Sequence, residues 1–449
     1  MKLTIVASGD FFSDYGGGQV YVRNLVDELV RRRLACENTG NTDNCNTIEV
    51  SVISYVKNTN PTARDYKGIS IYQVNDEESF RNALQQIRPD IVHANGEKLT
   101  TARLCKELGI PCVVTAHHGG LVCPAGTLLN TDDEICRSPA DYSHCLKCYL
   151  RNTPTGLFWY PLLKQYSQER YSKIGQRLER LPNIPFLSPI GRTGLIVSRK
   201  LAEWKELSET ATHFIAPSDA MAEALRRNGC PEGKITVIPH GIPDKNITIK
   251  NQSSREGNTS HISHLTSHII NFYYVGRINY VKGIHILLKA FSSIENPNIK
   301  LHLIGGAGTK AEQRYMDRLK NKYHKDSRII WHGKVPYDQM QNTIKAFNCL
   351  VHPTICLEIF GLDIAEALIQ NKYVIATRCG GAEMQIHNEK EGLLVEPNNI
   401  NELKNAIIHY SNTPTSTNSK VLSIKQHTEQ LLELYKTTLK KLHIAPKQV

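Results

Sequence analysis

Two glutamates and a glycine lie close together in the C-terminal half of the sequence. Glu358 precedes Gly361, near which the pattern predicts the start of a helix, and Glu366 follows inside that helix at E-x7-E spacing. The start of a helix exposes unpaired backbone N–H groups and a partial positive charge, which suit a diphosphate. Gly361 allows close approach, and the two carboxylates offer acceptors to hydroxyls on either side. Because two hydroxyl-rich groups flanking a diphosphate describe a nucleotide sugar, this segment predicts a nucleotide-sugar site.

The elements that must position these residues alternate between strand and helix along the chain. Apolar runs of strand length occur at 3–7, 48–56, 69–74, 91–93, 112–115, 213–216 and 235–238, and again at 272–275, 300–304, 329–331, 349–352 and 373–376. Segments with helical spacing lie between many of them, and a last helical pattern covers 422–442. Such alternation predicts parallel sheets with crossover helices, in which ligands bind at the carboxyl ends of the strands.

A polar, Ser/Asn/His-rich segment interrupts this alternation and divides the chain. We predict an α/β protein with two doubly wound domains and a cleft between them. The N-terminal, acceptor-side domain covers 1–245 and includes a cysteine-rich loop at 119–150; a linker covers 246–268. The nucleotide-sugar domain covers 269–410, and we expect the helical segment 411–449 to pack back towards the N-terminal domain.

Composition narrows the class of protein. The chain has 449 residues with globular composition, and no apolar run approaches the ~20 residues of a membrane-spanning helix. Lys and Arg number 54 against 43 Asp and Glu, a net charge of +11 that suits a phosphorylated ligand, an anionic membrane surface or nucleic acid. The basic residues are dispersed and do not alternate with aromatics on one element, which weighs against nucleic acid. The short apolar start and the apolar setting of several cysteines predict a cytoplasmic protein.

Four cysteines form a separate cluster in a polar loop. Cys123, Cys136, Cys145 and Cys148 follow the spacing C-x12-C-x8-C-x2-C. Four thiolates suit a structural, tetrahedral Zn2+, and a closed site of this kind leaves no open position for catalysis. Four unpaired thiols, disulfides and an iron–sulfur cluster remain alternatives.

The stretch 158–205 mixes aromatic and basic side chains. It contains Phe158, Trp159 and Tyr160 followed by Lys164 and Arg170. A basic amphipathic helix with aromatics suits the surface of an anionic membrane, which predicts a peripheral contact on its cytoplasmic face. An ordinary helix with a solvated basic face is the alternative.

Several further motifs accompany the two glutamates. They are Gly276-Arg277 and Lys282-Gly283 in YYVGRINYVKGIHILL, LIGGAG at 303–308, HGKVPYDQM at 332–340, IPHGI at 238–242, the Gly16–Gly18 loop and Thr115-Ala116-His117. With them, most of the chain resembles the family 4 glycosyltransferases. These are retaining sugar transferases of the GT-B fold, in which two Rossmann-like domains face a central cleft.

The resemblance implies a role for each matching side chain. Arg277 and Lys282 match the basic pair that binds the donor diphosphate and stabilises it as leaving group. Glu358 matches the carboxylate that faces the transferred sugar, and Glu366 the one that accepts the ribose hydroxyls. His117 matches the histidine near the reacting sugar.

The resemblance also implies donor-binding positions around these side chains. They are Gly17, Gly18, Gly276, Val335, Phe360, Gly361 and Leu362. The first two glycines match a loop that approaches donor and acceptor, and the Phe-Gly-Leu loop directs backbone amides to phosphate and sugar. The valine lies where the backbone recognises the base. His118 and His240 depart from the family, which often has Asp and Asn there.

Together these features predict a retaining glycosyltransferase. It would move a sugar from a nucleotide donor, UDP- or GDP-linked, to a glycan, a lipid-linked or a small-molecule acceptor in surface polysaccharide or glycoconjugate biosynthesis. The sequence contains no D-x-D motif, so Arg277, Lys282 and the helix start are expected to stabilise the diphosphate without a catalytic metal. A nucleotide-sugar epimerase of the same fold and a basic, zinc-containing binding module are the alternatives.

Overall fold

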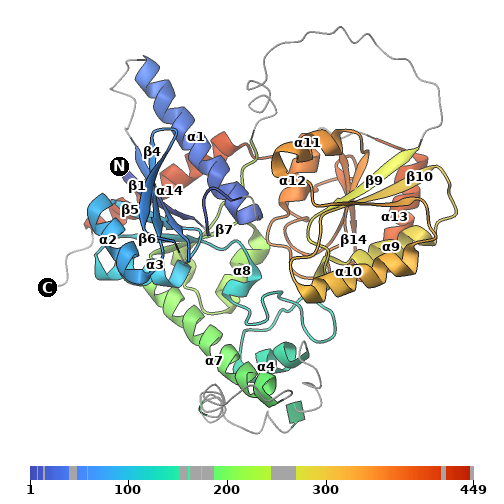
Figure 1. Ribbon diagram of the computed structural model, residues 1–449, viewed down its shortest axis with the longest axis horizontal. Helices are drawn as coiled ribbons and strands as arrows, with labels where there is room; N and C mark the ends of the chain where they lie inside the picture. Colours follow the sequence, from blue (N-terminus) through green and yellow to red (C-terminus); the bar gives the residue numbers. More distant parts are fainter. Residues whose placement is uncertain are drawn as a thin grey trace. The chain divides into compact units, whose positions relative to one another are not determined.

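The chain forms two compact units (Figure 1). The computed structural model describes residues 1–7, 9–13, 16–39, 48–57, 59–151, 160–161, 173, 187–243, 269–415 and 421–444. Unit 1 comprises Met1–His240 and Lys425–Val449, and unit 2 comprises Gly241–Ile424. The linker predicted at 246–268 lies outside the described residues.

Unit 1 is built on an eight-stranded sheet with the order β3-β4-β2-β1-β5-β6-β7-β8. Its strands are β1 (Lys2–Ala7), β2 (Glu49–Tyr55), β3 (Thr62–Tyr66), β4 (Ile69–Val74), β5 (Ile91–Ala94), β6 (Cys112–Thr115), β7 (His213–Ala216) and β8 (Ile235–Val237). Neighbouring strands pair in parallel, except that the edge strand β3 runs antiparallel to β4. Every residue of β5 and β6 is buried, as expected for central strands of a parallel sheet with both faces covered.

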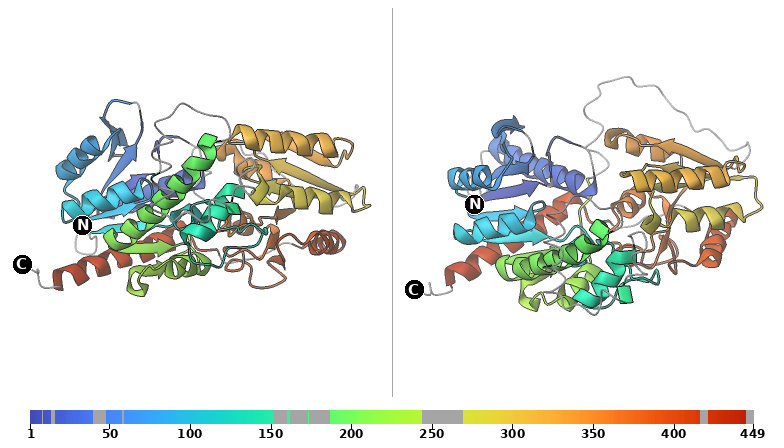
Figure 2. Two further views of the ribbon diagram at one scale, coloured as in Figure 1. Left: turned by 90° about the horizontal axis from the view of Figure 1, so that it is seen from below. Right: turned by 60° about the horizontal axis from the view of Figure 1, so that its bottom comes forward.

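Helices cover both faces of this sheet (Figure 1). They are α1 (Gly17–Thr39), α2 (Glu77–Ile87), α3 (Lys98–Glu107), α4 (Tyr142–Arg151), α7 (Leu187–Thr210), α8 (Asp219–Arg227) and α14 (Ile424–Ile444), with short 3-10 turns η1 (Gly119–Leu121) and η2 (Glu232–Lys234). Although α14 comes last in the chain, it belongs to this unit (Figure 2). Leu431 and Tyr435 of α14 are buried in one core cluster with Leu3 and Ile5 of β1.

Unit 2 is a six-stranded, wholly parallel sheet with the order β11-β10-β9-β12-β13-β14. Its strands are β9 (Ile270–Val275), β10 (Ile299–Ile304), β11 (Ile329–Gly333), β12 (Cys349–His352), β13 (Tyr373–Thr377) and β14 (Gly392–Val395). Its helices are η3 (Tyr280–Lys282), α9 (Ile284–Ser292), α10 (Lys310–Tyr323), α11 (Tyr337–Lys345), α12 (Leu362–Ile369) and α13 (Ile400–Asn412). In the order of this sheet β9 and β12 are neighbours, and the chain leaves them toward opposite edges, to β10 and to β13. Ligands bind at the carboxyl ends of strands beside such a switch point.

The strands predicted from apolar runs all form, and two further strands join them. The sequence analysis missed β3 because its side chains are exposed or half-buried, so the edge strand has no apolar run. It also missed β14, a four-residue strand that begins at Gly392. Close packing explains this glycine, because a Cβ there would lie 2.3 Å from the carbonyl oxygen of Val374.

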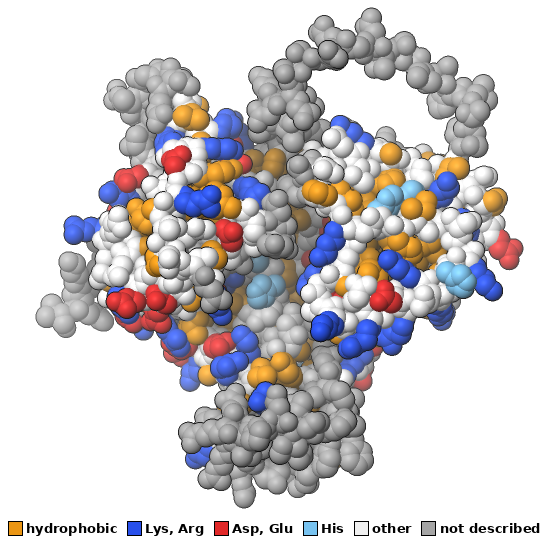
Figure 3. Space-filling model, in the orientation of Figure 1, with side chains coloured by type: hydrophobic (Ala, Val, Ile, Leu, Met, Phe, Trp, Pro, Cys, Tyr) orange, Lys and Arg blue, Asp and Glu red, His pale blue; other side chains and the backbone are white. Residues whose placement is uncertain are grey.

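Part of the excess positive charge is concentrated on one helix of unit 2. Basic side chains gather along α10 (Figure 3), where Lys310, Arg314, Arg318 and Lys322 are exposed at intervals of four residues. Residues four apart lie on one face of a helix, so these cations form a stripe. Among the described residues, no helix is both long enough and apolar enough to span a membrane.

Candidate active site

Lys282 is placed by a tight turn after β9. It ends η3, whose first turn is capped by the Asn279 side chain, which accepts a hydrogen bond from the Lys282 backbone N–H at 3.2 Å. The next residue, Gly283, has φ 68° and is the N-cap of α9. A Cβ on Gly283 would lie 1.8 Å from the carbonyl oxygen of Pro353. Only glycine therefore lets this turn pack directly against the loop that follows β12.

Glu358 lies in that loop, between β12 and α12. Its backbone is fixed by two hydrogen bonds: its N–H donates to Cys379 O at 2.7 Å, and its carbonyl accepts from Gly381 N at 2.8 Å. A Cβ on Gly381 would lie 2.3 Å from Phe360 O, so this close approach also requires glycine. The loop after β13 thus holds the loop of Glu358 in a defined position.

Lys282 and Glu358 form a largely buried ion pair. Lys282 Nζ lies 2.5 Å from Glu358 Oε2, and the two side chains are 22% and 17% exposed. Burial alone would raise the pKa of Glu358, but Lys282 and His352 outweigh burial and hold this pKa far below its usual range. Burial would likewise lower the pKa of Lys282, but Glu358 raises it. Both groups are therefore charged at neutral pH.

His352, the last residue of β12, joins this pair, although the sequence analysis did not single it out. Its Nδ1 lies 2.7 Å from Asp363 Oδ2, and its Nε2 lies 3.3 Å from Glu358 Oε2. The side chain is 2% exposed. Burial lowers the pKa of His352, but the two carboxylates outweigh burial and raise it to about 9. The sequence does carry a signal for the pair of His352 and Asp363. It is a polar residue at the carboxyl end of a predicted strand, followed by an acidic residue in the first turn of the next helix.

Arg277 lies at the carboxyl end of β9, on the same edge of the sheet. Its side chain is exposed, and its carbonyl oxygen accepts a hydrogen bond from the Tyr274 hydroxyl at 2.6 Å. The backbone of the preceding Gly276 bonds to Ile304 O of β10 at 3.0 Å. Arg277 and Lys282 follow β9 and Glu358 follows the neighbouring strand β12, so the three predicted residues lie after the carboxyl ends of adjacent strands.

The remaining predicted donor positions of unit 2 lie at the same edge. Gly361, with φ 84°, is the residue before α12, and its carbonyl accepts a hydrogen bond from Gln385 Nε2 at 3.3 Å. Phe360 is buried, and Leu362 is the first residue of the helix. Glu366 is half-buried inside α12, and Val335 is half-buried in the loop after β11. Asp363 in the first turn of α12 contacts His352, which lies beside Glu358, so the start of α12 is close to the ion pair.

In unit 1, Gly17 and Gly18 begin α1. Among the described residues, no heavy atom lies within 4 Å of a Cβ built on Gly18. The packing that requires Gly283 in unit 2 does not apply here. Packing within the described part of unit 1 therefore gives no reason for a glycine at position 18. A functional reason would be the approach of a ligand to the start of α1.

His117 follows β6 and belongs to a buried polar network. Its Nε2 lies 2.7 Å from Asn95 Oδ1, and its Nδ1 lies 3.3 Å from His240 Nε2. The Tyr21 ring packs against both imidazoles. Burial holds the pKa of His117 well below its usual range, and the neighbouring His240 lowers it further. His117 is therefore a neutral imidazole at physiological pH.

The network extends to α14, which the sequence analysis did not connect with His117. His427 Nδ1 lies 2.6 Å from the carbonyl oxygen of Pro239, so this nitrogen donates the hydrogen bond. His427 Nε2 must then accept from the Tyr21 hydroxyl, 2.8 Å away. In the same way Tyr435 of α14 bonds to His93 Nδ1 at 2.7 Å. Histidines spread along the whole chain thus meet in the interior of unit 1.

The four cysteines of the cluster lie in one region of unit 1. Cys145 and Cys148 are on α4; the Cys136 and Cys148 sulfurs lie 3.5 and 3.9 Å from His144 Nε2. Within the described residues, which include all four cysteines, no group of three or more His, Cys, Asp or Glu side chains is arranged to hold a metal ion. The geometry lends the zinc hypothesis no support, and it stays a prediction. Most of the basic stretch at 158–205, including Phe158 and Trp159, lies outside the described residues.

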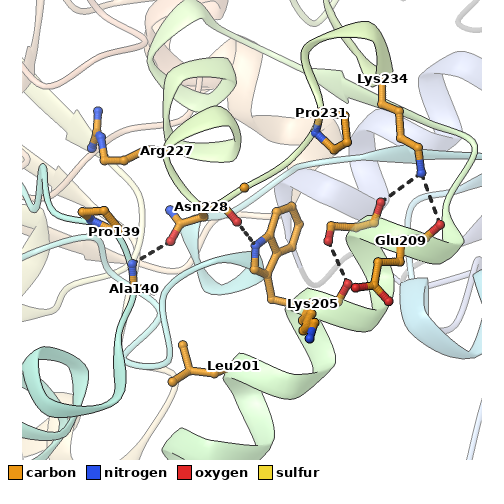
Figure 4. Close-up of a pocket in the computed structure, with 12 residues that line it drawn as sticks. Pro139, Ala140, Leu201, Lys205, Glu209, Arg227, Asn228, Pro231 and Lys234 are labelled. Carbon is orange, nitrogen blue, oxygen red and sulfur yellow. Dashed lines mark hydrogen bonds between the residues drawn. The ribbon is translucent and has the colours of Figure 1, made fainter.

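A cavity of about 640 Å³ in unit 1 (Figure 4) is lined by none of the predicted catalytic or donor-binding residues. It is lined by the ends of α7 and α8 and by Pro139 and Ala140. Asn228 fastens its wall, because its side chain accepts from Ala140 N and its carbonyl accepts from Trp204 Nε1, each at 2.7 Å. These segments lead into the amino ends of β7 and β8, opposite to the edge where such sheets bind substrates. We therefore interpret this cavity as a gap where the cysteine-rich loop packs against α7 and α8, and not as a substrate site.

Family models match both units of the chain. The model described as "Glycosyl transferases group 1" matches residues 268–441, and the model described as "Glycosyltransferase Family 4" matches residues 15–139 and 186–246. Together with two parallel-sheet units, these matches define the class as glycosyltransferases of the GT-B fold. Within that class, the chain belongs to glycosyltransferase family 4, which confirms the family predicted from the motifs.

Curated relatives match part of the chain. An uncharacterized glycosyltransferase of Methanocaldococcus jannaschii is 25% identical over 237 residues, which cover 50% of this chain and 60% of the relative. The phosphatidylinositol N-acetylglucosaminyltransferase gpi3 subunit of Schizosaccharomyces pombe is 26% identical over 192 residues, or 42% of this chain and 38% of the relative. The chain thus spans less than two thirds of the length of these relatives.

Solved structures match nearly the whole chain and share its fold. Sucrose-phosphate synthase from Thermosynechococcus elongatus superposes with a TM-score of 0.60 at 18% identity, covering 98% of this chain and 97% of that one. HepE from Anabaena, solved with UDP and glucose, gives 0.57 at 15% identity over 99% and 100% of the chains. The catalytic domain of starch synthase IV from Arabidopsis thaliana, bound to ADP and acarbose, gives 0.59 at 13% identity over 98% and 99%.

Proposed function

We propose that the protein transfers a glycosyl group from a nucleotide-diphosphate sugar to an acceptor hydroxyl, with retention of the anomeric configuration. The observation that carries this proposal is the buried ion pair of Lys282 and Glu358 at the carboxyl ends of β9 and β12. Arg277 and the start of α12 lie at the same edge. Cations and a helix start suit a diphosphate, and a charged carboxylate beside them suits sugar hydroxyls.

In the proposed reaction, the bond between the anomeric carbon and the diphosphate oxygen breaks, and its electron pair stays on the diphosphate. Arg277, Lys282 and the N–H groups at the start of α12 stabilise this developing charge, because preorganised donors need no rearrangement as the charge forms. The acceptor oxygen attacks the anomeric carbon on the face that the diphosphate leaves. Its proton passes to the departing diphosphate. Glu358 orients the sugar and forms no covalent intermediate.

We infer that unit 1 supplies the acceptor side of the reaction. His117 is neutral and hydrogen-bonded through both ring nitrogens. A neutral imidazole suits an uncharged sugar better than a diphosphate. Glu366 in unit 2 would accept the ribose hydroxyls, and the backbone at Val335 would recognise the base.

The donor we propose is a UDP- or GDP-sugar, bound without a catalytic metal. HepE was solved with UDP-glucose, and starch synthase IV with ADP, so nucleotide-diphosphate ligands occur in proteins that share this fold. In this proposal Arg277 and Lys282 carry the positive charge that a metal ion supplies in other transferases. Turnover that is unchanged by chelation with EDTA is the expected result.

The acceptor we propose is a glycan, a lipid-linked or a small-molecule hydroxyl compound, in surface polysaccharide or glycoconjugate biosynthesis at the cytoplasmic face of a membrane. The exposed cationic stripe on α10 supports contact with an anionic surface, because basic residues near such a surface are attracted to it. Flotation with anionic and neutral vesicles tests this contact. Equal recovery with both kinds of vesicle would count against it.

A thermal-shift screen against UDP-, GDP- and ADP-sugars tests the proposed function first. A donor that binds only the folded chain raises the melting temperature. The donor that stabilises the chain is then offered with acceptors, and the anomeric configuration of the product is read by NMR. Lys282→Ala should abolish the shift, whereas Lys289→Ala, an exposed lysine on the adjoining α9, should keep it. A donor consumed and converted without any acceptor would indicate the epimerase instead.

A further inference from the structure

The buried charges beside the proposed donor site form a chain of alternating sign. Lys282 contacts Glu358, Glu358 lies beside His352, and His352 contacts Asp363. The imidazole is the most buried of the four side chains, at 2% exposed against 17% to 22% for the others. Nδ1 makes a hydrogen bond with Asp363 Oδ2 at 2.7 Å, whereas Nε2 lies 3.3 Å from Glu358 Oε2 without the geometry of a hydrogen bond, so that contact is an ion pair. Two carboxylates this close to a buried imidazole favour its protonated form, the imidazolium.

Lys282 faces two competing demands if the proposed function holds. In the structure its ammonium pairs with Glu358 at 2.5 Å. A bound donor places a diphosphate, with more negative charge than one carboxylate, within reach of the same cation. A carboxylate left in a buried site with no cation is strongly unfavourable and would take up a proton. Glu358 therefore needs a second cation to stay ionised beside the sugar.

We propose that His352 is a positioning residue of the donor site: its imidazolium, anchored by Asp363, keeps Glu358 ionised and in place when the donor diphosphate draws Lys282 away. This inference rests on the proposed function and names a residue to which the family resemblance assigned no role. Asp363 belongs to the first turn of α12, so the helix that faces the diphosphate also holds the histidine.

The titratable groups around the network leave His352 as the one expected to change charge between pH 6 and 9. Glu358 and Asp363 face the imidazole directly, and Lys282 lies behind Glu358. Tyr273, Tyr274, Cys356 and Cys379 interact electrostatically with members of this network, and Arg277 and Glu366 lie around them. Burial raises the pKa of the two tyrosines, and it raises those of Cys356 and Cys379 to about 11 and 12, so that all four stay neutral.

Two variants test the proposal through different properties of the ring. His352→Asn removes the cation, and Asp363→Asn keeps the ring but removes the anchoring charge. We expect H352N to bind the nucleoside diphosphate within about threefold of wild type, and to lose turnover by about tenfold or more, the size seen when partners that orient active-site ligands are removed. His302→Asn is the matched control, because His302 is a buried histidine on β10 that bonds to His332 and Asn271.

The pH profile separates a positioning role from a purely structural one. In D363N the pKa of His352 should fall towards its ordinary value, so turnover at pH 8 should drop several-fold relative to pH 6.5. Wild type and H302N should show no such drop over this range. If D363N follows the wild-type profile, or if H352N turns over normally, the proposal is wrong.

A direct reading of the histidine distinguishes failure of this proposal from failure of the proposed function. Heteronuclear NMR of protein labelled in its histidine rings, with His352 assigned by difference from H352N, should show an imidazolium at pH 8 that becomes neutral at lower pH in D363N. A neutral His352 ring at pH 7 in wild type overturns the proposal even if the enzyme transfers sugar. An imidazolium in a chain that binds no nucleotide sugar instead counts against the proposed function. Melting temperatures of both variants show whether they fold.

Discussion

The histidine network of unit 1 and His352 of unit 2 lie in opposite electrostatic settings. In unit 1, His93, His117 and His427 bond to hydroxyls, an amide oxygen, another imidazole and a backbone carbonyl. Burial lowers the pKa of His93 to about 3 and that of His427 to about 4. In unit 2, His352 is just as buried, but its two carboxylate partners raise its pKa to about 9. The partners, and not the depth of burial, therefore decide the charge.

This contrast matches the division of labour that we propose. A diphosphate leaving group requires fixed charge, and unit 2 provides a chain of four ionised side chains. An acceptor hydroxyl requires neutral donors and acceptors, and unit 1 provides imidazoles and an amide. The predictions below break or sharpen this contrast, starting with the largest expected effect.

Removing a cation from unit 2 should have the largest effect. We expect Lys282→Ala or Arg277→Ala to remove about 3–4 kcal/mol of transition-state stabilisation, by analogy with lost oxyanion donors, and so to lower turnover. Steady-state transfer rates measure this loss, with Lys289→Ala as the control. Near-normal turnover in both variants would reject the role of the cations.

Glycines of the two units should respond differently to a methyl group. Gly283→Ala forces a Cβ against Pro353 O at positive φ, so we expect about 2–3 kcal/mol of lost stability. Gly18→Ala meets no described atom within 4 Å and should leave the free energy of unfolding unchanged within about 0.5 kcal/mol. If Gly18 is needed for ligand approach, this variant should fold normally and still lose transfer activity. Thermal denaturation and transfer assays measure both. A normally active G18A would remove Gly18 from the proposed site.

His427 of unit 1 and His352 of unit 2 should contribute to stability in opposite pH directions. The folded pKa of His427, about 4, lies below its ordinary value of 6.5, so its contribution is complete above pH 6.5 and is lost as pH falls towards 4. The folded pKa of His352, about 9, lies above 6.5, so its contribution is complete below pH 6.5 and is lost as pH rises towards 9. Each histidine changes the free energy of unfolding by up to about 1.4 kcal/mol per pH unit within its window.

Hydrogen exchange of peptides from each unit between pH 5 and 8.5, corrected for intrinsic rates, measures these opposite slopes. His427→Gln should flatten the acid slope of unit 1, and H352N the basic slope of unit 2. If neither variant changes the pH slope of its own unit, the assigned charges are wrong.

The smallest effect should come from a single hydrogen bond in unit 1. Tyr21→Phe removes the hydroxyl that donates to His427 Nε2 and leaves a buried acceptor unsatisfied, at a cost of about 1 kcal/mol. Chemical denaturation measures the loss. A phenylalanine variant as stable as wild type would show that this bond does not hold α14 to the unit.

Patterns local in sequence predicted the strands and the proximity of Glu358 to the start of α12. The family resemblance added Arg277 and Lys282. Neither source revealed His352 as a charged group, because a histidine at the end of an apolar strand reads equally as a neutral core residue. Its charge depends on Asp363, which reaches it only once α12 has formed.

The histidine network of unit 1 was even harder to predict from the sequence. His427 and Tyr435 come from α14, hundreds of residues after their partners Tyr21 and His93. No local periodicity encodes such a contact. The edge strand β3 was missed for a different reason, because its exposed side chains give no apolar signal.

Calorimetric titration with UDP, GDP and ADP tests most directly whether the charges of unit 2 grip a diphosphate. We predict that at least one of these nucleotides binds the wild-type chain. Lys282→Ala should weaken this affinity by about tenfold or more, as expected for loss of a charge-assisted bond. Lys289→Ala should leave the affinity unchanged. Absence of binding by all three nucleotides, or equal affinity in the wild type and in Lys282→Ala, would contradict the account.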